Sequence, residues 1–196
     1  MTPEQQIALC IGHSRFIGER RDGGAVAADG KTNEWTFNRF LASLIAEFLH
    51  DQHGLNSVII DAYQGTSYSK AMRWLAAELK EIGGVALAVE LHFNAANGKA
   101  GGHEWLHWHN SKHATLAAME LHMAVSQALP ALKCRGLKPI GASDRGGEFL
   151  RLTHCPSVIC EPFFGDNPQD WALANGAKES LAIALAAGLA AASKRL

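Results

Sequence analysis

The feature that most constrains the fold of this chain is the apolar run from Val85 to Leu91. Gly83 and Gly84 open the run, and no polar residue interrupts it before Glu90. An apolar stretch that is this short, and that follows two glycines, is typical of a buried strand rather than a helix. We therefore expect the chain to build its core around a β-sheet.

Segments of the same kind alternate with helical patterns along the chain. Apolar runs predict strands at residues 7–11, 57–62, 85–91, 105–108, 149–152 and 157–160. Apolar residues at helical spacing predict helices at residues 32–53, 67–82, 111–129 and 168–196, with loop-rich stretches at 18–30 and 131–148. This alternation predicts an α/β sandwich with a largely parallel, twisted sheet of about six strands and helices on both faces. No repeat or linker divides the chain, so we expect residues 1–196 to form one domain.

The bulk composition excludes several classes of protein. The formal net charge is -1 at pH 7, so the chain has no excess of basic residues with which to bind nucleic acid or an anionic membrane. No stretch has the length of a membrane span, and the start of the chain lacks the basic and apolar regions of a signal peptide. The four cysteines show no C-x-x-C spacing, which favours reduced thiols and folding in a cytoplasm. We expect a monomer that does not insert into membranes.

Chemically versatile side chains follow the predicted strands. His92 comes directly after the run 85–91, His13 follows the strand at 7–11, and Glu161 follows the strand at 157–160. In open α/β sheets, ligands bind outside the carboxyl ends of the strands, so these side chains are expected to meet. Glu34 lies early in the first predicted helix. Two imidazoles and one carboxylate can hold a catalytic zinc ion, and a further carboxylate can accept a proton from water. Together the four residues predict a zinc hydrolase site.

The order and spacing of these residues resemble the zinc-dependent N-acetylmuramoyl-L-alanine amidases of the Amidase_3 type, a family of bacterial cell-wall hydrolases and phage endolysins. The matching segments are Ile11-Gly12-His13, Asn33-Glu34-Trp35, Leu91-His92-Phe93-Asn94-Ala95, Gly102-His103-Glu104 and Pro156-Ser157-Val158-Ile159-Cys160-Glu161-Pro162-Phe163-Phe164. Two positions depart from the pattern: Cys10 stands where the family has Asp, and Phe163 where it has Gly. The missing Asp leaves the support of His13 unassigned, because a metal-bound His usually contacts a second polar group.

The resemblance implies a fold, an activity and a set of site residues. It implies a single catalytic domain, without a separate wall-binding module, that cleaves the amide between N-acetylmuramic acid and L-alanine in peptidoglycan. His13, Glu34 and His92 would bind one zinc ion per chain, and Glu161 would act as general base. The remaining candidates for support of the site or contact with substrate are Asn94, Glu104 and Arg151. A phage-type endolysin, made in the cytoplasm and released to the cell wall by a holin, is the setting that fits best.

A second zinc motif keeps another function open. His103-Glu104-Trp105-Leu106-His107 matches H-E-x-x-H, the signature of zinc metallopeptidases. That motif requires a helix, whereas Gly101-Gly102 and the following aromatic residues favour a strand, on which the two histidines would lie about 13 Å apart. A zinc peptidase and a non-catalytic wall-binding protein on a decayed amidase fold are the alternatives. Taken singly, His13 or His92 could be a core histidine and Glu34 a first-turn helix acid; their joint order favours the metal site.

Overall fold

The computed structural model describes residues 5–196, and the part of the signal-peptide prediction that rests on residues 1–4 lies outside the described residues. Within that range the chain forms eight strands and six helices. The strands are β1 (Gln6–Ile11), β2 (Phe16–Ile17), β3 (Arg20–Arg21), β4 (Asn56–Ile60), β5 (Val85–Leu91), β6 (His103–Trp108), β7 (Cys134–Ile140) and β8 (Ser157–Glu161). The helices are α1 (Glu34–His53), α2 (Tyr68–Ile82), α3 (Lys112–Ala128), α4 (Gly147–Leu152), α5 (Pro168–Gly176) and α6 (Lys178–Ser193).

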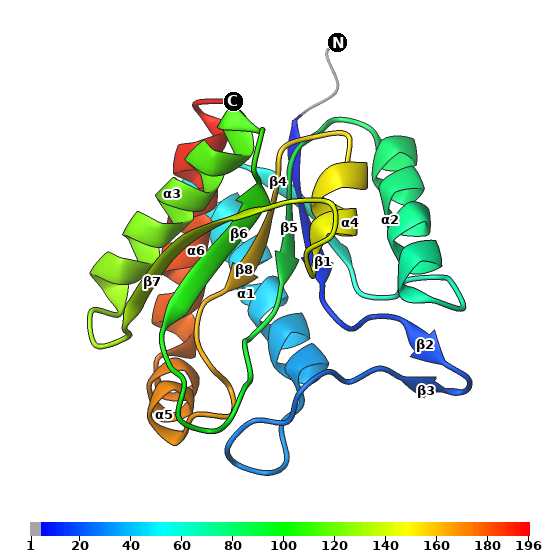
Figure 1. Ribbon diagram of the computed structural model, residues 1–196. Helices are drawn as coiled ribbons and strands as arrows, with labels where there is room; N and C mark the ends of the chain where they lie inside the picture. Colours follow the sequence, from blue (N-terminus) through cyan, green and yellow to red (C-terminus); the bar gives the residue numbers. More distant parts are fainter. Residues whose placement is uncertain (1–4) are drawn as a thin grey trace.

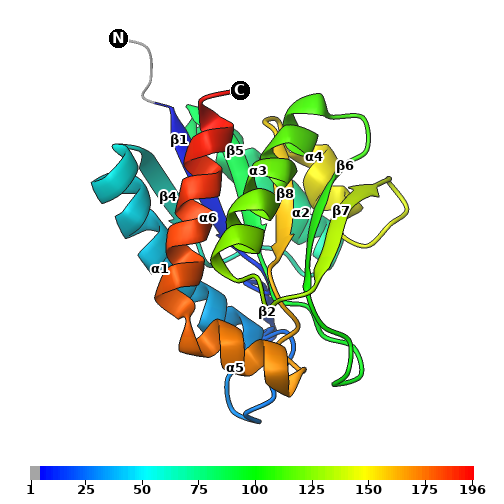
Figure 2. The ribbon, with the colours of Figure 1, turned by 90° about the vertical axis from the view of Figure 1, so that its left-hand side faces the viewer.

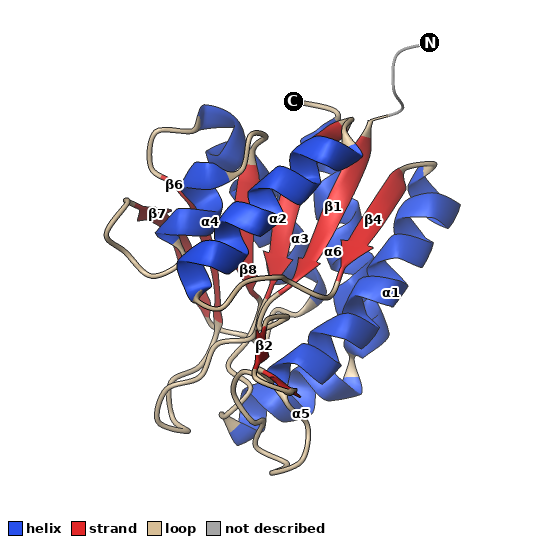
Figure 3. Ribbon diagram, turned by 90° about the vertical axis from the view of Figure 1, so that its right-hand side faces the viewer, coloured by secondary structure: helices blue, strands red, loops and turns tan. Residues whose placement is uncertain are grey.

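One central sheet organises the molecule (Figure 1). Its six strands run in the order β4-β1-β5-β8-β6-β7, and every neighbouring pair is parallel except β6 with β8. Helices α1, α3 and α6 cover one face of the sheet (Figure 2), and α2 and α4 cover the other (Figure 3). The predicted α/β sandwich, with a largely parallel six-stranded sheet and helices on both faces, is therefore confirmed.

The central strands are apolar on both sides because both sides face a core. Along β1, Ile7, Leu9 and Ile11 pack with α1, α3 and α6, whereas Ala8 and Cys10 belong to the core beneath α2 and α4. Successive side chains of a strand point to opposite faces, so two cores require a continuously apolar run rather than an alternating one. This is the pattern by which the sequence predicts β1 and β5.

Three local predictions were wrong. Residues 149–152 form part of α4 rather than a strand, and β7 lies in a stretch predicted to be a loop. Four residues show too little periodicity to separate a strand from one helical turn. The β7 strand contains Gly136 and Pro139. It can contain proline, which has no amide hydrogen, because it lies at the edge of the sheet and has a partner strand on one side only. The single C-terminal helix is in fact two helices, α5 and α6.

The candidate site residues His13, His92 and Glu161 lie along one edge of the sheet, the edge that the ends of the strands form. Strands β1, β5 and β8 run in the same direction, so their carboxyl ends meet at this edge. Because β6 runs antiparallel to β8, the beginning of β6 reaches the same edge, where Glu104 pairs with Glu161. Among the described residues, no helix combines the length and the apolar character that crossing a membrane requires.

Candidate metal centre and cleft

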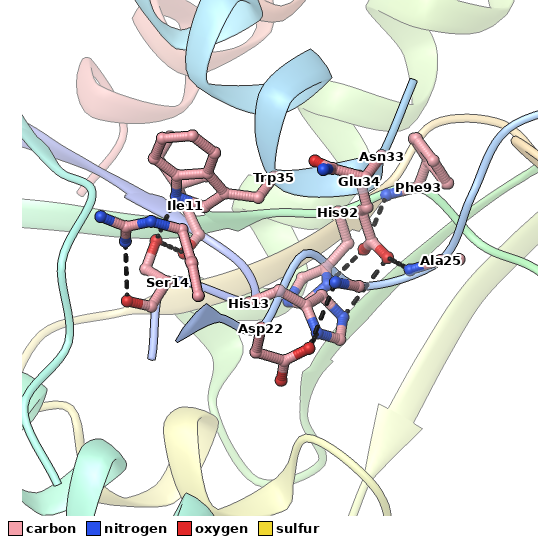
Figure 4. Close-up of polar contacts among 12 residues, drawn as sticks. Ile11, His13, Ser14, Asp22, Ala25, Asn33, Glu34, Trp35, His92 and Phe93 are labelled. Atoms are coloured by element: carbon pink, nitrogen blue, oxygen red, sulfur yellow. Dashed lines mark hydrogen bonds and ion pairs between the residues drawn. The ribbon is translucent and has the colours of Figure 1, made fainter. Parts of the chain in front are cut away.

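His13 stands on a tight turn directly after β1. Its backbone has a φ of 58°, and the described part of the chain contains no other non-glycine residue with positive φ. The turn is closed by Ser14, whose buried hydroxyl donates a hydrogen bond to the carbonyl of Ile11 over 2.6 Å. A side chain in the left-handed region is strained, and such strain is often found where a functional group must be aimed. The turn directs the His13 ring toward the start of α1 (Figure 4).

Glu34 is the first residue of α1, and its carboxylate is almost fully buried. Asn33 caps the helix by accepting a hydrogen bond from the amide of Thr36 over 2.9 Å. The cap fixes where the helix begins, and therefore where Glu34 points. The two carboxylate oxygens also accept hydrogen bonds from the amides of Ala25, at 3.1 Å, and Phe93, at 3.2 Å.

His92 follows β5 without a break in the sheet, because its amide donates to the carbonyl of Cys160 at the end of β8. The Nδ1 atom of His92 lies 2.8 Å from Oε1 of Glu34, and Nε2 of His13 lies 3.3 Å from Oε2 of the same carboxylate. Ligand atoms of His13, Glu34 and His92 all lie within 4.8 Å of one another. Residues from three separate elements thus converge on one point, as Figure 4 shows.

The outer nitrogen of each imidazole faces a carboxylate that the sequence analysis missed. Nδ1 of His13 lies 3.3 Å from Oδ1 of Asp22, and Nε2 of His92 lies 3.3 Å from Oε2 of Glu90. Asp22 is therefore a polar partner of His13, the kind of group that the sequence left unassigned when it placed Cys10 at the family's Asp position. Metal-binding histidines usually contact such a group, which fixes the ring and its tautomer. For Glu90 the sequence does carry a signal: it is a charged residue inside a buried strand, two positions before His92 and so on the same face.

Burial and these contacts set the pKa values of the cluster. Burial alone would raise the pKa of Glu34, but the hydrogen bond from His92 and the charges of both histidines outweigh it and lower the pKa of this carboxyl. Burial also disfavours charged His92, yet its contacts with Glu34 and Glu90 raise the pKa of the imidazole well above the ordinary value. A metal ion bound here would replace that proton, because a coordinating imidazole must be neutral.

Two glycines leave space for the cluster. Gly24 has a φ of +70°, and a Cβ at this position would lie 2.6 Å from Oε2 of Glu34 and 2.7 Å from the His13 ring. A Cβ at Gly12 would overlap the ring of His92. Backbone approaches this close are possible only for glycine. The glycines of the loop and of the first turn therefore shape the metal centre directly.

Glu161 is the last residue of β8 and lines the same cavity of about 490 Å³ as His13 and His92. Its Oε2 atom is buried and has no hydrogen-bond partner among the described residues. Burial raises the pKa of Glu161 to about 8, His92 opposes that shift, and the nearby charges of Glu34 and Glu104 add to it. Glu161 thus places a buried carboxyl group beside the cluster, with a raised proton affinity and with no hydrogen-bond partner at Oε2 among the described residues.

Asn94 and Glu104 also line this cavity and contact each other. The amide of Asn94 donates to Oε1 of Glu104 over 2.7 Å, and Nε of Arg135 donates to Oε2 over 2.8 Å. Since Glu104 lies opposite Glu161 in the sheet, this network fixes the wall next to Glu161. From the sequence alone, Arg135 could equally line a substrate groove or be a solvated loop charge.

Arg151 lies elsewhere. It is exposed on α4 and lines a separate cavity of about 320 Å³, together with Trp108 at the far end of β6 and Ser157 at the start of β8. Because Glu161 is at the other end of β8, Arg151 does not border the metal centre. The substrate role predicted for Arg151 therefore receives no support from its position.

The H-E-x-x-H match does not form a metal site in the described structure. His103 and His107 lie on strand β6, as the flanking residues predict, and both are buried. His103 accepts a hydrogen bond from the indole of Trp105 over 3.0 Å, and Nδ1 of His107 contacts the hydroxyl of Thr115 at 3.1 Å. These are core histidines with internal partners, and the only group in the described range with metal-binding geometry is His13, Glu34 and His92.

The arrangement combines a three-residue metal-binding group with an unpartnered carboxylate on the wall of an open cavity. Two imidazoles and one carboxylate are a known ligand set of catalytic zinc, and the fourth position of such a site is left to water or substrate. A carboxylate beside that position can accept a proton and return it. The geometry therefore supports metal-assisted hydrolysis of a substrate bound in the cavity.

Comparison with known proteins agrees with this geometry. Residues 7–191 match the sequence profile of a family described as N-acetylmuramoyl-L-alanine amidase. No curated protein sequence matches the chain.

Solved structures show the same fold. The catalytic domain of the CD27L endolysin, which targets Clostridia difficile, superposes with a TM-score of 0.77 at 24% identity, covering 95% of this chain and 97% of that one. The catalytic domain of the amidase CwlV from Bacillus (Paenibacillus) polymyxa var. colistinus gives 0.72 at 21% identity, covering 94% and 96%. The amidase AmiC2 of Nostoc punctiforme gives 0.71 at 20%, covering 94% of both chains.

Proposed function

This chain belongs to the N-acetylmuramoyl-L-alanine amidase family, and we propose from that premise that it hydrolyses the amide between the lactyl group of N-acetylmuramic acid and L-alanine in peptidoglycan. The observation that carries the proposal is the convergence of His13, Glu34 and His92 next to Glu161 on one cavity wall. The structural neighbours, which are described as amidases and an endolysin catalytic domain, support the same substrate. The site of action is then the cell wall, reached in the endolysin setting after release by a holin.

The ligand set fits a single zinc ion. Its donors are two imidazole nitrogens and one carboxylate, and each imidazole has a carboxylate on its outer nitrogen. This is the ligand and support pattern of catalytic zinc sites. Zinc bound by His13, Glu34 and His92 would supply the Lewis acidity that activates water and polarises the scissile carbonyl. Asp22 and Glu90 would hold the two rings in the orientation that binding requires.

Glu161 performs the proton transfers in this proposal. Its buried, unpartnered Oε2 accepts the proton of the attacking water and later returns that proton to the leaving amine of L-alanine. The Asn94–Glu104–Arg135 network keeps the neighbouring strand in place, and its Glu104 carboxylate places a negative charge near Glu161. Negative charge there favours the protonated acid that the leaving amine needs.

The bond cleaved is tested by digesting purified peptidoglycan and analysing the products by mass spectrometry. We expect new L-alanine amino termini and free stem peptides, with the glycan strands intact. New reducing sugar ends would indicate a glycosidase. Cuts inside the stem peptide would favour the peptidase alternative, and either product would contradict the proposed function.

The role of Glu161 is tested by Glu161→Gln, which keeps the shape of the side chain but removes the proton acceptor. We expect bound zinc to stay at the wild-type level while turnover falls by roughly 10²–10⁴-fold, the usual contribution of general acid–base catalysis. Zinc content and turnover are measured on the same preparation. Loss of zinc would make Glu161 a ligand, and normal turnover would remove it from the mechanism.

A further inference from the structure

Tyr63 contacts a neighbour of each imidazole of the candidate metal centre, although it lies outside every motif that identifies the site. It follows β4, and its side chain is only 4% exposed. Its amide donates to the carbonyl of Ser14 over 3.1 Å, and a parallel bridge joins it to Arg15. Since Ser14 directly follows His13, the backbone of Tyr63 holds the turn that carries the first imidazole.

The side chain of Tyr63 reaches the second imidazole through Glu90. The phenol donates to Oε1 of Glu90 over 3.2 Å, and Oε2 of Glu90 lies 3.3 Å from Nε2 of His92. Glu90 and His92 are two residues apart at the end of β5, so both side chains project from the same face of the sheet. Tyr63, Glu90 and His92 thus form a continuous chain of polar contacts.

Glu90 has no evident structural reason to be charged. It is 3% exposed and lies next to the core beneath α2 and α4, where an apolar residue would pack without a desolvation cost. A buried carboxylate is costly unless it is hydrogen-bonded or paired. Among the described residues its polar partners are Tyr63 and His92, so this buried charge is stabilised through contacts that lead to the candidate metal centre.

Tyr63 is suited to hold this carboxylate. Burial raises the pKa of its phenol well above the ordinary value, and the charge of Glu90 raises it further, so the hydroxyl remains a hydrogen-bond donor. The ring packs 6.5 Å from that of Trp74 on α2, which limits its rotation. The position of Glu90 is therefore fixed from outside the ligand set.

We propose that Tyr63 and Glu90 act as a positioning pair that orients both metal-binding histidines, Tyr63 through its amide toward His13 and through Glu90 toward His92. The proposal rests on the proposed function only in that His13, Glu34 and His92 are the ligands. Zinc affinity then depends partly on Tyr63 and Glu90, although neither residue is a ligand of the ion. Glu90 supports the ring from its outer nitrogen, as carboxylates commonly do for metal-bound histidines.

The test is the zinc affinity of purified variants, measured by competition with a chromophoric chelator, which requires no hydrolysis. Glu90→Gln should weaken binding by roughly 10–100-fold, the usual effect of losing such a partner. Tyr63→Phe should weaken it less, because Glu90 stays in place. The double variant should bind zinc no more weakly than Glu90→Gln alone, since both changes break one chain of contacts. The matched control is Glu148→Gln, a carboxylate that lines the same cavity without contacting either histidine, and its affinity should equal that of the parent.

Two further measurements separate positioning from a general loss of structure. Thermal unfolding of the metal-free variants shows whether each still folds, and Tyr63→Phe keeps the test valid if Glu90→Gln does not. The coordination number of the metal is followed by the absorption spectrum of the cobalt-substituted protein. In both variants the intensity of the cobalt bands should equal that of the parent, because no ligand is lost.

Three outcomes would overturn the proposal: unchanged affinity in Glu90→Gln, additive losses in the double variant, or a cobalt spectrum showing one ligand fewer, which would make Glu90 itself a ligand. If the affinities shift as expected but peptidoglycan stays intact under the wild-type protein, the proposed function fails and the positioning pair stands. If the wild-type protein hydrolyses peptidoglycan but the zinc affinities of the variants do not change, the proposed function stands and the positioning pair fails.

Discussion

The two imidazoles of the candidate metal centre, those of His92 and His13, are held in different ways. On the strand side, His92 continues β5, and its partner Glu90 has a side chain that is 4% exposed. On the loop side, His13 occupies a strained turn, and its partner Asp22 is 31% exposed. The strand side also contains Glu161, because β8 lies next to β5.

This difference suggests separate roles for the two sides: the strand side fixes the orientation of its imidazole, and the loop side leaves room for substrate to approach. A ring anchored by a sheet and by a buried carboxylate loses little freedom when it binds a metal ion. A ring on a loop, with a partner open to water, leaves one side of the site reachable for a polymeric substrate. Water can also replace part of what Asp22 does, whereas nothing in the described structure replaces Glu90. The comparison predicts that changes on the strand side will have the larger effects, unless they remove a ligand outright.

The largest effects should come from the ligands themselves. We expect His92→Ala and His13→Ala each to abolish zinc binding and hydrolysis, because either change leaves two protein ligands. Metal content is measured by atomic absorption together with activity on peptidoglycan. His107→Ala serves as the control and should retain zinc. A protein that loses zinc with His107→Ala but retains it with His13→Ala would refute the assignment of the site.

The next effect concerns the space around His13. Gly24→Ala should reduce zinc affinity and activity strongly, because the added Cβ would press on the His13 ring and on Glu34. Gly30→Ala is a matched control: Gly30 has a nearly equal φ of +69°, but a Cβ there meets nothing within 4 Å. Both variants carry the backbone strain, so a difference in zinc affinity between them isolates the contact with the metal centre. Equal zinc affinities in the two variants would show that the loop containing Gly24 moves to accommodate the added Cβ.

Asp22→Asn should have a smaller effect than Glu90→Gln, and this difference tests the comparison directly. Asp22 is partly solvated, so we expect only a few-fold loss of zinc affinity, below the usual range for a buried partner. Chelator competition under identical salt and pH measures both variants. If Asp22→Asn proves the weaker binder, the loop side would be the one that determines affinity.

The smallest effect is a pH-dependent change in stability on the strand side. In the metal-free protein, burial raises the pKa of Glu161 to about 8, compared with an ordinary value of 4.5. A raised carboxyl pKa contributes stability that is fully present below pH 4.5 and is lost as the pH rises to 8, because over this range the unfolded chain releases the proton of Glu161 while the folded protein still binds it. Glu161→Gln never acquires that charge, so its melting temperature should exceed that of the parent by an amount that grows from pH 5 to pH 9. A constant difference over this range would mean that Glu161 is solvated.

The parts of the molecule that were predictable from sequence are those with a strong local signal. Strand β5 is continuously apolar, and His92 follows it, so both the strand and the position of the ring at the sheet edge could be inferred. Helix α1 has its cap and periodicity, which place Glu34 at its start. Helix α4 and strand β7 carry no such signal, because one is a single short helical segment and the other contains glycine and proline.

Asp22 and Tyr63 approach the site only through tertiary contacts and were missed for that reason. Asp22 lies in a Gly-rich loop whose path is set by the turn at His13 and by the capped start of α1. Tyr63 is 27 residues from Glu90 in sequence, and only the pairing of β4, β1 and β5 brings them together. Arg151 lines a cavity near the start of β8, so its predicted role in substrate contact receives no support from the fold.

Reconstitution of the metal-free protein is the most direct test of whether one zinc ion per chain supports hydrolysis. Zinc is removed with a chelator, and hydrolysis of peptidoglycan is then measured as zinc is added back in known amounts. We expect the stripped protein to be inactive, and activity to rise linearly and stop at about one zinc per chain, the content of a mononuclear catalytic site. Full activity in the stripped protein, or a rise that continues to two zinc ions per chain, would contradict a single centre formed by His13, Glu34 and His92.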